Sequence, residues 1–167
     1  KIILDEMGSL DGNGLSYSSR EFVHVVVIGA DNLSLHVARQ AALICHYPNF
    51  NDETGRYRTI ITIVNPQSGS RKDVEIMKTM FTEVTGNLMS ECMWTCCYYG
   101  ENIERWSSSK NKSFIDVEFQ FIGINEDGIE TLLKELVTEN NDAIVNIINN
   151  GYALTDETVS WLTQHCY

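Results

Sequence analysis

Residues 29–34, Gly-Ala-Asp-Asn-Leu-Ser, have the types and spacing that could bind a phosphate group. They follow a β-branched run, FVHVVVI, and open a segment with helical spacing, which is the context of the G-x-G-x-x-G dinucleotide-binding fingerprint. Free N–H groups at a helix N-terminus attract anions. The candidate cofactor-binding turn therefore consists of six consecutive residues: Gly29, Ala30, Asp31, Asn32, Leu33 and Ser34.

The three glycine positions of this fingerprint hold Gly29, Asp31 and Ser34. Gly29 allows the tight turn, and Ser34 is small enough for the helix to pack closely on the strand. Asp31 leaves two interpretations open. Either a phosphate binds despite the added carboxylate, or Asp31 caps the helix and occupies the position that a phosphate would use.

Asn65, at the end of the second β-branched run, is the candidate ligand for an adenosine ribose. An acid at this position is usual for NAD. Asn65 bonds a hydroxyl without charge, and the hydroxyls and cations of Ser68–Lys72 would suit the 2′-phosphate of NADP. Alternatively, Asn65-Pro66 is a simple turn, and Arg71 and Lys72 are solvated residues of a first helical turn. The expected cofactor is NAD(H) or NADP(H), or none.

The five cysteines and four histidines form no recognisable catalytic or metal-binding pattern. Cys92, Cys96 and Cys97 supply three thiols, whereas a zinc site needs four ligands, commonly in paired C-x2-C spacings. Helical spacing would place Cys92 and Cys96 on one face, but buried free cysteines do the same. An odd number of cysteines in an apolar chain of this length indicates reduced thiols and a cytoplasmic location.

The elements that would position these residues alternate between buried strands and helices. Strands are predicted at Phe22–Ile28, Thr59–Val64, Ile115–Ile124 and Ala143–Ile148. Helices are predicted at Asn32–Cys45, Lys72–Val84, Gly128–Thr138 and DETVSWLTQH, the last with Thr155 as its N-cap. Residues 89–114 fit no single state.

This alternation predicts an α/β fold of Rossmann-like, three-layer α/β/α type. The sheet should be mostly parallel, with strand order 3-2-1-4. Four strands are fewer than the six of a full Rossmann sheet, so the domain is either truncated or naturally short. Residues 1–20 are predicted to be an irregular N-terminal lead-in, and residues 21–167 form the Rossmann-like domain.

The bulk composition excludes several classes of partner. The chain of 167 residues carries a formal net charge of −11, which argues against nucleic acid and against anionic membrane surfaces. No stretch approaches the roughly 20 apolar residues of a membrane span, so direct membrane insertion is not expected.

The segments HVVVIGADNLSLHVARQAALICHYPNF and RTIITIVN resemble the TrkA-N family of Rossmann domains, which accompany bacterial potassium transporters and channels. The later pattern FIDVEFQFIGINEDGIETLLKEL and DAIVNII is similar to that family's third strand, helix and fourth strand. The resemblance covers residues 22–167, and residues 22–65 are its specific part. It departs at Asp31, Ser34 and Asn65, where family members usually have glycines and an acid.

The resemblance implies a non-catalytic regulatory or ligand-sensing domain of a larger protein. Its ligand would be NAD(H) or another adenine nucleotide that acts as a signal, and its partners would be other domains of the same protein or a second copy in a homodimer. Two alternatives stay open. One is a remnant NAD(P)-dependent oxidoreductase domain, and the other is an interaction scaffold that has lost nucleotide binding.

Overall fold

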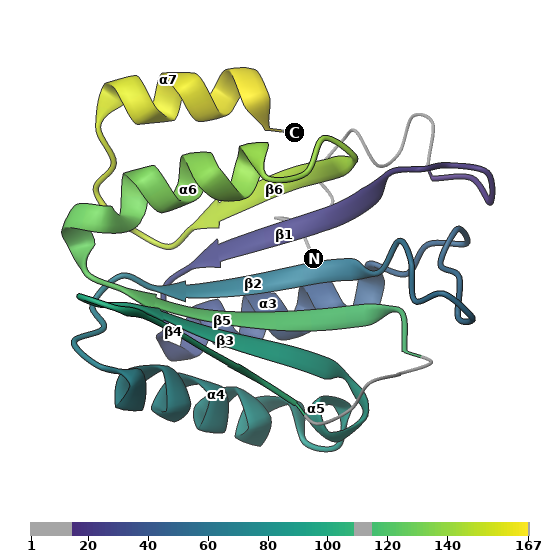
Figure 1. Ribbon diagram of the computed structural model, residues 1–167, viewed down its shortest axis with the longest axis horizontal. Helices are drawn as coiled ribbons and strands as arrows, with labels where there is room; N and C mark the ends of the chain where they lie inside the picture. Colours follow the sequence, from purple (N-terminus) through teal and green to yellow (C-terminus); the bar gives the residue numbers. More distant parts are fainter. Residues whose placement is uncertain (1–14, 109–114, 167) are drawn as a thin grey trace.

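A six-stranded sheet forms the centre of the protein in the computed structural model, which describes residues 15–108 and 115–166 (Figure 1). The strands are β1 (Phe22–Ile28), β2 (Thr59–Asn65), β3 (Met93–Tyr99), β4 (Ile103–Ser107), β5 (Val117–Ile124) and β6 (Ala143–Asn149). They lie in the order β4-β3-β5-β2-β1-β6. All neighbours are parallel except β3 and β4, which form an antiparallel hairpin.

Helices cover both faces of the sheet and produce three layers (Figure 1). One layer contains α3 (Asn32–Ile44), α4 (Arg71–Thr85) and the short α5 (Leu88–Glu91). The other contains α6 (Ile129–Thr138), which follows the 3-10 turn η1 (Glu126–Gly128), and α7 (Asp156–His165). The fold is therefore α/β with a mostly parallel sheet, in agreement with a Rossmann-like architecture.

Each face of the sheet contributes to a separate hydrophobic core. On the α3 and α4 side, Phe81 packs edge-to-face on Phe119 and Phe121, with ring centroids 5.0 and 5.6 Å away. On the other side, Ile28 and Leu133 belong to the second core. Because β1 is buried on both faces, its sequence is almost continuously apolar.

The predicted strand order needs correction, because the observed sheet has six strands and not four. The two additional strands, β3 and β4, come from the segment for which no state was predicted, and they occupy the edge beyond β5. The four predicted strands lie in the relative order β5-β2-β1-β6. The chain passes from β2 through α4 to β3 and leaves a gap, which β5 later fills.

Cys92 and Cys96 do not share a helix face, although helical spacing would have placed them on one. Cys92 is the C-cap of α5, and Cys96 lies within β3. Cys45, Cys96, Cys97 and Cys166 are free thiols. Residues 15–108 and 115–166 contain no group of three or more His, Cys, Asp or Glu side chains that could hold a metal ion.

Two further expectations concern the termini and the membrane. Within the described part of the chain, no helix is long and apolar enough to cross a bilayer. Residues 1–14 of the predicted lead-in lie outside the described residues, and residues 15–20 contain a turn between irregular segments. At the other end, Thr155 accepts a hydrogen bond from the Thr158 amide, as expected of an N-cap.

Candidate functional site

A cleft of about 760 Å³ lies at the carboxyl ends of β1, β2, β5 and β6. We call it the carboxyl-edge cleft; its lining comprises Gly29, Ala30, Asp31, Asn65, Gln67, Glu126, Ile129, Asn150, Gly151, Tyr152 and Ala153. The chain leaves β1 toward one face of the sheet and enters β6 from the other, so the cleft lies at the topological switch point. Open α/β sheets bind their ligands at this place.

Gly29 is required by the backbone of the turn between β1 and α3. Its φ is 134°, in the region that side chains other than glycine rarely adopt. A Cβ atom added to Gly29 would lie 2.3 Å from the Ser34 hydroxyl oxygen. The first glycine of the fingerprint is therefore a structural necessity here, whether or not a phosphate binds.

Asp31 caps α3 and also holds the segment that follows β6. The Ser34 amide donates a 2.8 Å hydrogen bond to Asp31 Oδ1. The Asn150 side-chain amide donates to Asp31 Oδ2 at 2.8 Å and to the Ser34 hydroxyl at 3.0 Å. Hydrogen bonds from the Ser34 backbone and side chain, and then from Asn150, lower the pKa of Asp31. An ionised carboxylate therefore occupies the anion position at this helix N-terminus.

Asn65 lines the cleft, and its side chain also begins a turn. Its Oδ1 accepts a 3.0 Å hydrogen bond from the Gln67 amide. The Gln67 side chain donates at 3.0 Å to Glu126, which follows β5. This pattern agrees with the turn interpretation of Asn65-Pro66. It also brings a second carboxylate to the rim of the cleft.

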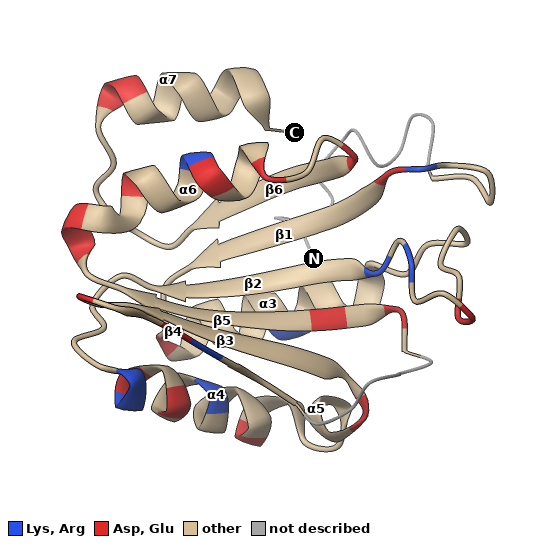
Figure 2. Ribbon diagram, in the orientation of Figure 1, with Lys and Arg blue, Asp and Glu red and all other residues tan. Residues whose placement is uncertain are grey.

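The charged residues that line the carboxyl-edge cleft are both acidic. Asp31 and Glu126 contribute carboxylates, and no lysine or arginine is among the lining residues. Burial, followed by the charges of Glu126 and Asp31, raises the pKa of Tyr152, so its phenol stays a hydrogen-bond donor. In Figure 2 the starts of α6 and α7 are red, whereas the blue residues of this end lie at the start of α4.

The six residues of the predicted turn occupy different positions. Gly29, Ala30 and Asp31 line the cleft, as does Asn65. Ser34 is buried behind Gly29. Asn32 and Leu33 do not line the cleft, and Leu33 lies on the outer surface with 61% of its area exposed.

The predictions missed Asn150, although the sequence contains a signal for it. The predicted order placed the fourth strand beside the first, so the polar residues after Ala143–Ile148 were candidate neighbours of Asp31. The contributions of Gln67, Glu126 and Tyr152 depend on turn geometry, for which the sequence carries no comparable signal.

Arg71 and Lys72 do not line the cleft. Arg71 instead stacks on Trp106 and pairs with Glu104 at 3.5 Å.

The chain matches no protein-family model, no curated protein and no solved structure.

Proposed function

We propose that this chain is a non-catalytic regulatory or ligand-sensing domain whose carboxyl-edge cleft binds an adenosine-type nucleoside without a pyrophosphate at the N-terminus of α3. The observation that carries the proposal is the Asp31 carboxylate. It accepts the N-terminal hydrogen bond of α3 and occupies the place of an incoming phosphate.

The lining of the cleft suits a ligand that is rich in hydroxyl groups. The carboxylates of Asp31 and Glu126 accept hydrogen bonds, as ribose hydroxyls would donate them. Tyr152 and Ile129 offer an aromatic and an aliphatic surface for a base. Polar groups and apolar surface thus meet at the position where Rossmann-like folds bind nucleosides.

A pyrophosphate fits this cleft poorly because of charge. Two like unit charges about 5 Å apart in a partly dry site oppose each other by about 3 kcal/mol. The lining supplies Asp31 and Glu126 but no cation to offset this repulsion. We therefore expect NAD(H) and NADP(H), the cofactors that the glycine pattern suggested, to bind more weakly than adenosine.

The regulatory role rests on the chemistry of the lining and on the TrkA-N resemblance. The described residues that line the cleft include no histidine, cysteine or lysine that could act as a base or nucleophile near neutral pH. In a TrkA-N-like domain, a bound nucleoside would act as a signal to other domains of the same protein or to a second copy. This role would place the domain in a larger potassium-transport protein.

Calorimetric titration with adenosine, AMP, NAD+, NADH and NADPH tests the proposal. Adenosine should bind, and the dinucleotides should bind at least roughly tenfold more weakly because of the repulsion described above. Asp31→Asn keeps a capping oxygen but removes the charge. This variant should therefore reduce the difference in affinity between adenosine and the dinucleotides. Asp52→Asn removes the same charge from an exposed loop residue outside the cleft and should change nothing.

Each other outcome contradicts part of the proposal. Tightest binding of NAD+ or NADH by the unchanged protein would overturn the exclusion of a pyrophosphate. A folded protein that binds none of the five probes would overturn the sensing role. It would favour the interaction scaffold, which the capped N-terminus of α3 also supports.

A further inference from the structure

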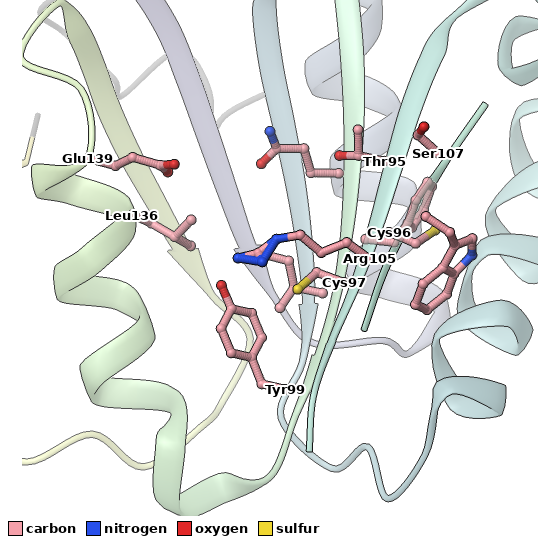
Figure 3. A pocket seen from close by; sticks show the side chains of 12 residues that line it. Thr95, Cys96, Cys97, Tyr99, Arg105, Ser107, Leu136 and Glu139 are labelled. Carbon is pink, nitrogen blue, oxygen red and sulfur yellow. The ribbon is translucent and has the colours of Figure 1, made fainter. Parts of the chain in front are cut away.

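A second pocket, of about 390 Å³, lies between α6 and the β3–β4 hairpin. We call it the hairpin pocket; its lining includes Tyr99, Arg105, Gln120, Leu136 and Glu139 (Figure 3). The layer of α6 and α7 packs on β1, β2, β6 and the carboxyl half of β5. On this side the described residues place no helix over β3 and β4, so the sheet forms the floor of the pocket.

Arg105 is the cationic group of the hairpin pocket. It extends from β4 across the sheet toward α6, above Tyr99 (Figure 3), and its guanidinium carbon is 5.9 Å from the Tyr99 ring centroid. Among the described residues Arg105 pairs with no carboxylate, unlike Arg71, which pairs with Glu104. A guanidinium beside apolar surface is suited to bind a carboxylate.

Gln120 adds a second donor whose orientation is fixed from inside the protein. The Thr62 hydroxyl donates to Gln120 Oε1 at 2.9 Å, and His24 Nε2 lies 2.7 Å from the same hydroxyl. Because Thr62 has one proton and gives it to Gln120, His24 must donate to Thr62. The Gln120 oxygen is therefore engaged, and its NH2 group remains available to the pocket.

This chain of hydrogen bonds lies on the face of the sheet that α6 and α7 partly cover, and its two inner members are buried. His24 and Thr62 are 5% and 0% exposed. Burial lowers the pKa of His24 to about 4, which keeps the ring neutral. Buried polar groups need partners or they destabilise the fold. Two buried residues that orient a side chain at the pocket floor are an arrangement expected of a binding site.

The wall of the pocket that α6 forms attracts positive charge. Glu139 is the C-cap of α6, and the carboxyl end of a helix carries a partial negative charge. Leu136, one turn earlier, supplies apolar surface. A ligand that bridges the pocket would therefore meet donors at Arg105 and Gln120, acceptors at Glu139 and an apolar wall between them.

We propose that the hairpin pocket binds a small zwitterion, an L-amino acid with an apolar side chain. Its carboxylate contacts Arg105 and the Gln120 NH2 group, its ammonium group lies at Glu139, and its side chain packs against Leu136 and Tyr99. Cavities of this size hold small ligands. This site is separate from the carboxyl-edge cleft and independent of what that cleft binds.

Calorimetry with L-leucine and L-phenylalanine tests this proposal. The control ligands each lack one charged group: 4-methylpentanoate and 3-phenylpropanoate lack the ammonium group, and 3-methylbutylamine and 2-phenylethylamine lack the carboxylate. At least one amino acid should bind, and its two analogues should bind roughly tenfold more weakly or worse, since each loses a charge-assisted contact.

The variants separate the two ends of the ligand. Arg105→Gln, Gln120→Glu and Glu139→Gln should each weaken the binding of the amino acid roughly tenfold. Arg39→Gln removes the same charge as Arg105→Gln, but from α3 on the other face of the sheet, and should leave the affinity unchanged. A urea unfolding curve for each variant establishes that it is folded.

Three outcomes would overturn the proposal. The first is no binding of either amino acid by the folded protein up to about 10 mM. The second is binding that Arg105→Gln does not weaken. The third is equal affinity for the amino acid and for its analogue without the ammonium group, which would show that Glu139 does not bind an ammonium group.

Discussion

The neutral ring of His24 has a consequence for stability that depends on pH. His24 lies within β1, between β2 and β6, and donates to Thr62. The ring is only 5% exposed, so water cannot solvate the charge that a second ring proton would bring. Its pKa falls from 6.5 to about 4 because of burial. An unfolded chain, in contrast, protonates this ring near pH 6.5.

Between these two pKa values the unfolded chain binds more protons than the folded protein, so the free energy of unfolding should fall as the pH falls. The contribution of His24 is complete above pH 6.5 and is lost progressively toward pH 4. From about pH 7.5 to about pH 5.5 the loss should be about 1.3 kcal/mol. Urea denaturation at both pH values measures it.

His24→Gln provides the control, because glutamine can still donate to Thr62 but does not titrate in this range. The variant should show a smaller loss than the unchanged protein over the same interval. Equal losses in the two proteins would mean that other groups cause the pH dependence and that His24 does not.

At the scale of elements, the β3–β4 hairpin is attached to α4 by alternating cations and indole rings. The Lys78 Nζ atom lies 3.8 Å from the Trp94 ring centroid, and the Arg71 guanidinium carbon lies 4.2 Å from that of Trp106. The Trp106 indole N–H donates to Glu75, which also pairs with Lys78 at 2.8 Å. These contacts hold an edge strand that has only one neighbour in the sheet.

Trp106→Phe should therefore destabilise the protein. The variant loses the hydrogen bond to Glu75 and the stronger cation–π partner of Arg71, which together are worth about 1–2 kcal/mol. Urea denaturation gives the value. Trp161→Phe makes the same change in α7, where the indole stacks on His165, and should have a smaller effect. A larger effect of Trp161→Phe would show that the hairpin attachment contributes little.

How far the sequence predicts the elements depends on how each one is buried. β1 and β2 are nearly continuous apolar runs, and their predicted positions agree with the structure within one residue. β3 is mostly half-buried, and β4 is mostly exposed, so neither carries a strong apolar pattern. Their positions are set by contacts with α4 and β5, which the pattern of residues 93–107 alone does not reveal.

The residues of the candidate site, too, were predictable only where the sequence carries a local signal. The turn after β1 was predictable because its glycine and its place between a strand and a helix are local features. The bonds from Asn150 to Asp31 join residues that are 119 positions apart, and only the strand order brings them together. The hairpin pocket was not predictable, because two of the strands that form it were not.

The whole molecule is strongly acidic, with 23 Asp and Glu residues against 12 Lys and Arg residues. Figure 2 shows the acids on both helical layers and in the loops. Among the described residues, Arg71 pairs with Glu104 and Lys78 pairs with Glu75, whereas the chain carries 11 more acidic than basic residues. Repulsion among the acidic residues opposes the compact state.

Salt should therefore stabilise this protein, because it screens repulsion between exposed charges. The free energy of unfolding measured with urea, an uncharged denaturant, should rise as sodium chloride is added at neutral pH. Sucrose, which adds no ions, serves as the comparison for effects of solute alone. A fall in stability with added salt would indicate that attractive pairs outweigh the repulsion.

The insertion of β5 between β2 and β3 also determines when the sheet can be completed. During synthesis the ribosome produces β2, α4 and the β3–β4 hairpin before β5, yet β2 and β3 have no ladder with each other. The hairpin can attach to α4, but it cannot join the sheet until residues 117–124 have been made and have paired on both sides. A nascent chain that ends before β5 would keep the inner edges of β2 and β3 unpaired, and such edges are sites of aggregation.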